Sequence, residues 1–206
     1  KMPDFTIIGD TGSAAEAYAA ENGFTFISTA GTTGSCTWHF DYAANTLTVS
    51  GAGAMADYSN SQRAPWYLFR DLIHHVVFED GVELAGAWSF YDSSNLTSVT
   101  FPEVFYTIGF AAFSHCAKLT AVDLPDTLTT LGSYSFEETA LTSVVIPDTV
   151  DTLSQQAFRG CAALTDVSIP EGVTTIGGSV FCGCPISHID LPFTLEAIGA
   201  GAFQDC

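Results

Sequence analysis

Basic side chains are scarce in this sequence. Its 206 residues include five Lys and Arg against 23 Asp and Glu, for a formal net charge of −18. A surface this acidic repels the phosphates of nucleic acids and the headgroups of anionic lipids. The charge balance therefore argues against both nucleic acid and a membrane surface as partners.

Long apolar runs are also missing. A membrane-spanning helix needs about 18 or more consecutive apolar residues, and no such run occurs. Lys1–Asp4 lack the pattern of a signal peptide. We therefore expect either that a targeting segment lies upstream of Lys1 or that the protein has none. Because 47% of the residues are hydrophobic, the acidity does not indicate disorder. Few charges and many Thr and Ser favour an extracellular or cell-surface location.

Motifs that carry chemistry are absent or incomplete. No H-E-x-x-H, G-x-S-x-G or P-loop pattern occurs. Asp10-Thr11-Gly12-Ser13 matches an aspartic protease signature, but that chemistry needs two such carboxylates and one copy is present. Cys182-Gly183-Cys184 has no second ligand pair that would complete a metal site. We therefore expect no enzyme activity, no metal and no cofactor.

A phenylalanine instead returns every 22 or 23 residues. The six positions are Phe90, Phe113, Phe136, Phe158, Phe181 and Phe203. A fixed period in this range is typical of a solenoid, in which each repeat is one coil stacked on the last. The sequence predicts a mainly β solenoid with short helical turns, in which the six rings stack inside.

The repeats divide the chain into six coils. We number them coil 1 (78–100), coil 2 (101–123), coil 3 (124–145), coil 4 (146–168), coil 5 (169–190) and coil 6 (191–206). A proline follows the first residue of coils 2 to 6 and is expected to end a strand. A glycine at 86, 109, 132, 177 and 199, replaced by Ser154 in coil 4, is expected at a sharp corner. Coil 6 stops at Cys206 before its own strand, so we expect the parent protein to continue.

Four cysteines share one repeat position: Cys116, Cys161, Cys184 and Cys206. Thr139 and Ser93 replace them in other coils. Exchange with small residues predicts a tightly packed inward site with free thiols. A bridge between neighbouring coils stays geometrically possible, since stacked strands lie about 5 Å apart.

Two pieces precede the coils. In residues 1–30 we expect a strand at 5–8, a helix capped by Ser13 and Glu16 and stopped by Gly23, and a strand at 24–28. Residues 31–77 are expected to form a linker at 31–35, a β-hairpin and a short helix at 65–70. Trp38, Trp66, Tyr67 and Phe69 are then available to cover the open end of the stack.

These motifs resemble the BspA-like, or treponemal-type, leucine-rich repeats. The family pattern stands almost unchanged in Ile169–Phe181 and Phe101–Val122, and the match covers residues 78–206. Residues 36–77 look like the cap module that precedes such arrays, and residues 5–28 look like the segment that closes a preceding array. The resemblance implies a right-handed coil array in a bacterial surface or secreted protein, with adhesion to host or bacterial proteins as the associated role.

Candidate contact residues are those that depart from the repeat or lie on its strands. Phe105, Tyr106 and Trp88 replace small or polar residues and are expected to be exposed, unless they pack against the cap or an adjacent coil. The exposed strand positions, Val145 among them, are mostly small and polar. The candidates there are Asp123, Asp166, His188 and Asp190.

The leading hypothesis is a non-catalytic module that binds a protein partner through the solenoid face. A structural spacer in a large modular protein and a glycan-binding module are the alternatives. The ligand, the array length and the anchoring mode are not encoded in any motif of the sequence.

Overall fold

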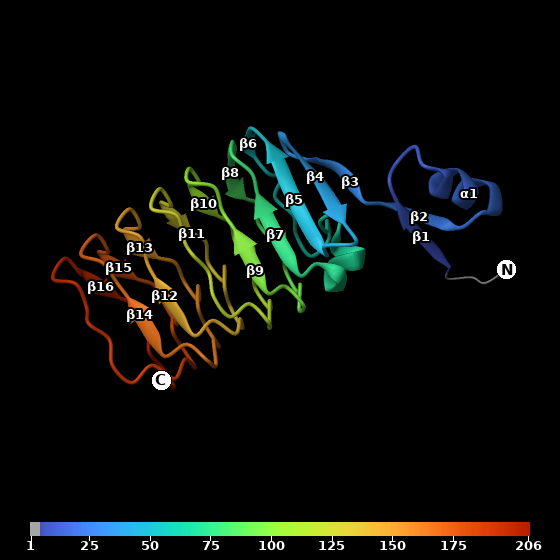
Figure 1. The fold of residues 1–206 in the computed structure, drawn as a ribbon. Helices are drawn as coiled ribbons and strands as arrows, with labels where there is room; N and C mark the ends of the chain where they lie inside the picture. Colours follow the sequence, from blue (N-terminus) through green and yellow to red (C-terminus); the bar gives the residue numbers. More distant parts are fainter. Residues whose placement is uncertain (1–4) are drawn as a thin grey trace.

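The computed structural model describes residues 5–206 as a solenoid joined to a small N-terminal unit (Figure 1). Residues 1–4, for which the sequence indicates no signal peptide, lie outside this range. The coils stack side by side along one axis, and each contributes backbone to parallel ladders. The expected mainly β repeat architecture is confirmed. Regular helix in the described range is limited to α1 (Ala14–Asn22) and a 3₁₀ helix, η1 (Tyr67–Leu72).

One ladder runs along the whole array. Its seven short strands follow the order β16-β15-β13-β11-β10-β8-β6 and pair in parallel. Their bounds are β6 (Gly53–Ala54), β8 (Val82–Ala85), β10 (Thr107–Ile108), β11 (Thr130–Leu131), β13 (Thr152–Leu153), β15 (Thr175–Ile176) and β16 (Ala197–Ile198). The sequence pattern predicted one strand in each coil, and this second one was missed.

The expected strands of coils 1, 3 and 4 lie in a second, interrupted ladder, which we call the strand face, while coil 5 has no regular strand at 187–190. A five-stranded sheet has the order β3-β4-β5-β7-β9, and β12 pairs separately with β14. The bounds are β3 (Ala30–Thr33), β4 (Cys36–Asp41), β5 (Thr46–Gly51), β7 (His75–Phe78), β9 (Ser98–Thr100), β12 (Ser143–Val145) and β14 (Asp166–Ser168). Coil 2 has no regular strand at 121–124, and this is where the strand face is broken.

The six repeat phenylalanines stack as expected. Consecutive ring centroids are 5.4 to 5.7 Å apart, with interplanar angles of 4° to 18°. Trp66 of the cap lies 5.5 Å from Phe90 at 21° and so extends the stack. Burial of each such ring contributes roughly 2 kcal/mol of transfer free energy. The stack therefore links the cap and all six coils in one apolar core.

The repeat glycines are required for a different reason from the one expected. Their φ angles are not left-handed, but a Cβ at Gly109 would lie 2.6 Å from the Ala87 nitrogen of the preceding coil. At Gly199 the distance to the Gly178 nitrogen would be 2.4 Å. Close approach of neighbouring backbones therefore explains these glycines. The left-handed residues come two positions later, for example Trp88 and Tyr134.

The repeat cysteines are free and mostly buried. Cys116, Cys161 and Cys184 lie in the core, and each thiol donates to the carbonyl of the repeat Phe in the preceding coil at 3.1 to 3.3 Å. Cys206 makes the same contact with Phe181 at 3.3 Å but is exposed. Cys206 therefore faces inward like the others, and it is exposed because no further described coil is stacked on it.

The N-terminal unit pairs β1 (Thr6–Gly9) in parallel with β2 (Thr25–Ser28), and α1 lies against both strands. The Ser13 hydroxyl accepts from the Glu16 amide at 3.4 Å, and Gly23 ends the helix with φ 65°, so both caps are confirmed. Glu16 accepts from the Gly12 amide, one residue earlier than in an ideal capping box. Ala19 is the one core residue of this unit among those described.

The expected linker at 31–35 is wrong. Ala30–Thr33 forms β3, which pairs antiparallel with β4 in a register that places Ala30 opposite His39. This pairing adds a strand to the expected hairpin of β4 and β5. The expected helix at 65–70 is the 3₁₀ helix η1, displaced by two residues. Trp38 packs at 5.4 Å from Trp66, and both cover the end of the stack as predicted.

Candidate functional site

Phe105 is a core residue, so of the two alternatives given for it, packing against an adjacent coil is the correct one and exposure is not. Its side chain is 0% exposed, and its ring lies 5.1 Å from Phe78 and 4.8 Å from Phe101. The equivalent positions in coils 3 and 4 are Leu128 and Val150, which are also fully buried. Aligning this repeat column would have identified Phe105 as an inward residue.

Tyr106 and Trp88 lie in different places. Tyr106 is exposed and precedes β10, where its amide donates to the Glu83 carbonyl at 2.8 Å. Trp88 is half-buried in the turn after β8, with its ring 4.5 Å from Tyr91 and 5.9 Å from Phe110. The structure therefore does not bring the two predicted aromatic candidates into one site.

The four polar candidates all lie exposed on the strand face. Asp123, Asp166, His188 and Asp190 come from three different coils. His188 Nε2 lies 3.3 Å from Asp190 Oδ1, but their side chains are 81% and 98% exposed. Exposed pairs of this kind contribute little stability, typically 0 to about 1 kcal/mol. Both side chains therefore remain accessible to a partner.

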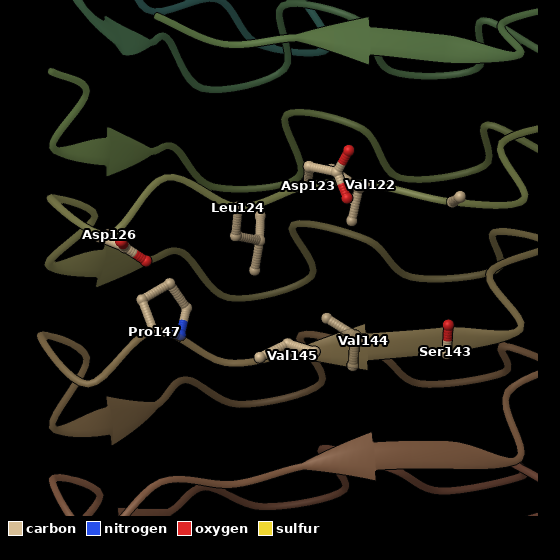
Figure 2. A pocket seen from close by; sticks show the side chains of 9 residues that line it. Val122, Asp123, Leu124, Asp126, Ser143, Val144, Val145 and Pro147 are labelled. Carbon is tan, nitrogen blue, oxygen red and sulfur yellow. The ribbon is translucent and has the colours of Figure 1, made fainter. Parts of the chain in front are cut away.

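A hollow opens on the strand face between coils 2 and 3, where the ladder is broken. Figure 2 shows that two neighbouring chain segments line it, with Val122, Asp123 and Leu124 opposite Val144 and Val145 of β12. Asp126 and Pro147 lie at one end, and the volume is about 220 Å³. The hollow combines an apolar lining with two carboxylates.

Missing backbone hydrogen bonds accompany the hollow. Within the described range, no backbone hydrogen bond involves the amides or carbonyls of residues 121–124. By contrast, β12 and β14 pair over three residues in register, with Ser143 opposite Asp166. Polar backbone groups of coil 2 are therefore left for water or a ligand at the edge of the hollow.

Val145 is the apolar residue that the hollow exposes. It is 69% exposed, whereas the equivalent positions in coils 1, 2 and 4 hold Thr100, Asp123 and Ser168. The exposed stripe predicted from the sequence included Val145 without distinguishing it. The signal that could have distinguished Val145 is its apolar side chain at a repeat position that is mostly polar.

Neither a cluster of metal ligands nor a membrane-spanning helix is found among residues 5–206. Residues 5–206 contain no group of three or more His, Cys, Asp or Glu placed to hold a metal ion. In the same range, no helix has the length and apolar character needed to cross a membrane.

Comparison with known proteins settles the family. The model of the BspA type leucine rich repeat region matches residues 83–206 in six copies, which is more than half of the chain. The chain belongs to the BspA-type leucine-rich repeat family. Repeats of this type are typically non-catalytic and generally mediate protein interactions. A comparison with curated proteins found no match.

Solved structures share the fold of this BspA-type chain. A leucine-rich repeat protein from Bacteroides ovatus aligns at TM-score 0.66 with 22% identity, over 85% of this chain and 51% of that one. A leucine rich cell surface protein from Faecalibacterium prausnitzii aligns at TM-score 0.63 with 26% identity, over 86% of this chain and 52% of that one. This chain thus spans about half the length of these two proteins.

Proposed function

We propose that this BspA-type array is a cell-surface or secreted interaction module that binds a protein partner through its strand face. The single observation that supports the proposal most is the hollow between coils 2 and 3, with exposed Val145 on its rim. Its volume of about 220 Å³ is below the ~300–1,000 Å³ typical of small-molecule sites. A hollow of this size suits one side chain of a protein partner.

The charge around the hollow favours a basic side chain. Asp123 and Asp126 line it, and both side chains are exposed. Neither carboxylate forms an ion pair within the described range. A Lys or Arg of the partner would bury its apolar stem against Val145 and Leu124 and place its charge between the carboxylates. The net charge of −18 increases the encounter rate with basic partners.

The test is a binding screen on immobilised host matrix proteins, mucins and bacterial surface proteins at physiological salt. A saturable hit should weaken at least tenfold for Val145→Lys and for Asp123→Asn, because the first places a cation where the partner's cation would bind and the second removes one of the two carboxylates. Thr100→Lys, at the equivalent position of coil 1, is the matched control and should bind normally. A folded sample with no hit, or hits unchanged in both variants, would favour a structural spacer instead.

A further inference from the structure

Aromatic side chains gather in the turns that follow β8, β10 and β11, next to Tyr67 of η1. We call these five residues the aromatic strip: Tyr67, Trp88, Tyr91, Phe110 and Tyr134. Besides the contacts of Trp88, the ring of Phe110 lies 5.2 Å from that of Tyr134. The Arg63 guanidinium lies 4.4 Å from the Tyr67 ring and 5.5 Å from the Tyr91 ring. The strip therefore crosses three coils as a continuous series of π faces.

The repeat does not require these aromatics. The position of Trp88 and Tyr134 is occupied in other coils by smaller or polar residues: Ala111, Gln156, Ser179 and Gly201. The position of Phe110 holds Ser133 in coil 3 and Gln155 in coil 4. Because the same turn forms with these residues, packing of the solenoid does not account for the rings in coils 1 to 3.

Two members of the strip have backbone conformations that bulky residues rarely adopt. Trp88 has φ 58° and Tyr134 has φ 62°. A left-handed conformation costs a residue other than glycine roughly 1–2 kcal/mol. The same left-handed conformation recurs at Ala111, Gln156 and Ser179, so it belongs to the repeat turn and not to the rings. The turn thus fixes the backbone direction from which Trp88 and Tyr134 project.

The strip is partly open to solvent and has a polar margin. Phe110 is 42% exposed, and Trp88, Tyr91 and Tyr134 are half-buried. The amide side chain of Gln155 is exposed beside Tyr134, whose amide donates to the Gln155 carbonyl at 3.1 Å. Sugar rings present apolar C–H faces and a rim of hydroxyl groups. Those faces suit the negative faces of aromatic rings, and the hydroxyls suit a polar margin.

Charge indicates an uncharged sugar. Arg63 Nη2 donates to Asn60 Oδ1 at 2.6 Å, and Nη1 is buried without a hydrogen-bond partner. The second arginine near the strip, Arg70, is paired with Asp92 at 2.8 Å. Arg70 is thus neutralised, while Arg63 forms no ion pair among the described residues. Acidic saccharides would nevertheless meet the repulsive field of a chain with net charge −18.

We propose that the aromatic strip binds neutral oligosaccharides by stacking sugar rings on Trp88, Phe110 and Tyr134. The strip spans three coils, and its rings are partly covered. A short chain of sugar rings suits the strip, because its successive rings lie 4.5 to 5.9 Å apart and stay partly open to solvent. This site shares no residue with the hollow, so it goes beyond the proposed protein-binding function.

A fluorescence titration can test the site directly. Of the three tryptophans, Trp38 and Trp66 are 4% and 0% exposed, so ligand-induced changes in emission will report on Trp88. A printed array of neutral and acidic glycans identifies the ligand class. Titrations with chitohexaose, cellohexaose and maltohexaose, and with hexagalacturonate as the acidic control, then give affinities. We expect at least one neutral glycan to bind saturably and to shift the emission.

The variants use residues that the repeat itself tolerates. Trp88→Gln and Tyr134→Gln copy Gln156 of coil 4, so they should fold, which circular dichroism checks. Both should weaken neutral glycan binding at least tenfold, measured by calorimetry. Tyr106→Ala, at an exposed tyrosine outside the strip, should bind normally. Three results would overturn the proposal: no neutral glycan retained above the Trp88→Gln background, tighter binding of hexagalacturonate, or loss of a protein ligand alone in Trp88→Gln.

Discussion

Among single residues, Phe105 and Tyr106 are adjacent yet differ completely in environment. Phe105 fills the core between Phe78 and Phe101, whereas Tyr106 points to solvent. Their replacement by alanine should therefore have opposite consequences, although both residues depart from the repeat pattern.

Phe105→Ala should lower the free energy of unfolding by about 3–5 kcal/mol, because it leaves a cavity in a fully packed site. Tyr106→Ala should change it by less than about 0.5 kcal/mol, as is usual for exposed positions. Urea unfolding followed by circular dichroism measures both. Equal effects of the two substitutions would contradict the assignment of Phe105 to the core.

The repeat glycines give a second prediction about single residues. Gly109→Ala should destabilise the protein by about 1–3 kcal/mol, the range for overpacking, because its Cβ would meet backbone atoms at 2.6 and 2.8 Å. Ser154 occupies the same repeat position and already carries a Cβ. Ser154→Ala is therefore the matched control, with an expected change within about 0.5 kcal/mol. A neutral Gly109→Ala in thermal unfolding would argue against close coil contact there.

For whole elements, repetition made the strands of coils 1, 3 and 4 predictable, along with the hairpin and the helix caps, whereas the expected strands of coils 2 and 5 are not regular. The period fixed which side chains stack, and six copies of one pattern outweigh a weak local propensity. The ladder that includes β10 and β11 was missed because two-residue strands have no periodicity to detect. β3 was missed because Gly31 and Gly34 suggest a linker, while its pairing with β4 depends on tertiary context.

The candidate site was less predictable than the fold. The exposure of Tyr106, Asp123 and His188 followed from their strand and turn positions. The hollow did not, because it arises where backbone pairing between coils 2 and 3 fails. The assignment of residues 5–28 to the end of a preceding array stays a prediction.

The column of thiols gives an element-scale prediction. In the native protein at pH 8, Ellman's reagent should react quickly with exposed Cys206 and half-buried Cys182 only. Burial raises the pKa of the Cys116 thiol, so little of the reactive thiolate forms there. After unfolding in urea, all six cysteines should react. Rapid reaction of four or more native thiols would show that the coils open readily.

Over the whole molecule, charge opposes compaction. With a net charge of −18, like charges repel along the solenoid, and salt screens this repulsion with a Debye length of about 8 Å at physiological ionic strength. Raising sodium chloride from low to physiological and higher concentrations should therefore increase Tm, as measured by calorimetry. Potassium chloride should act equally. A Tm that falls with either salt would contradict a dominant role for self-repulsion.

The central claim is that one invariant core presents two independent surfaces, the hollow and the aromatic strip. The most direct test is to titrate a protein ligand and a neutral glycan, each taken from its screen, against wild type, Val145→Lys and Trp88→Gln. Val145→Lys should lose the protein and keep the glycan, and Trp88→Gln should do the reverse. Loss of both ligands in either folded variant, or of neither ligand in both, would contradict the central claim.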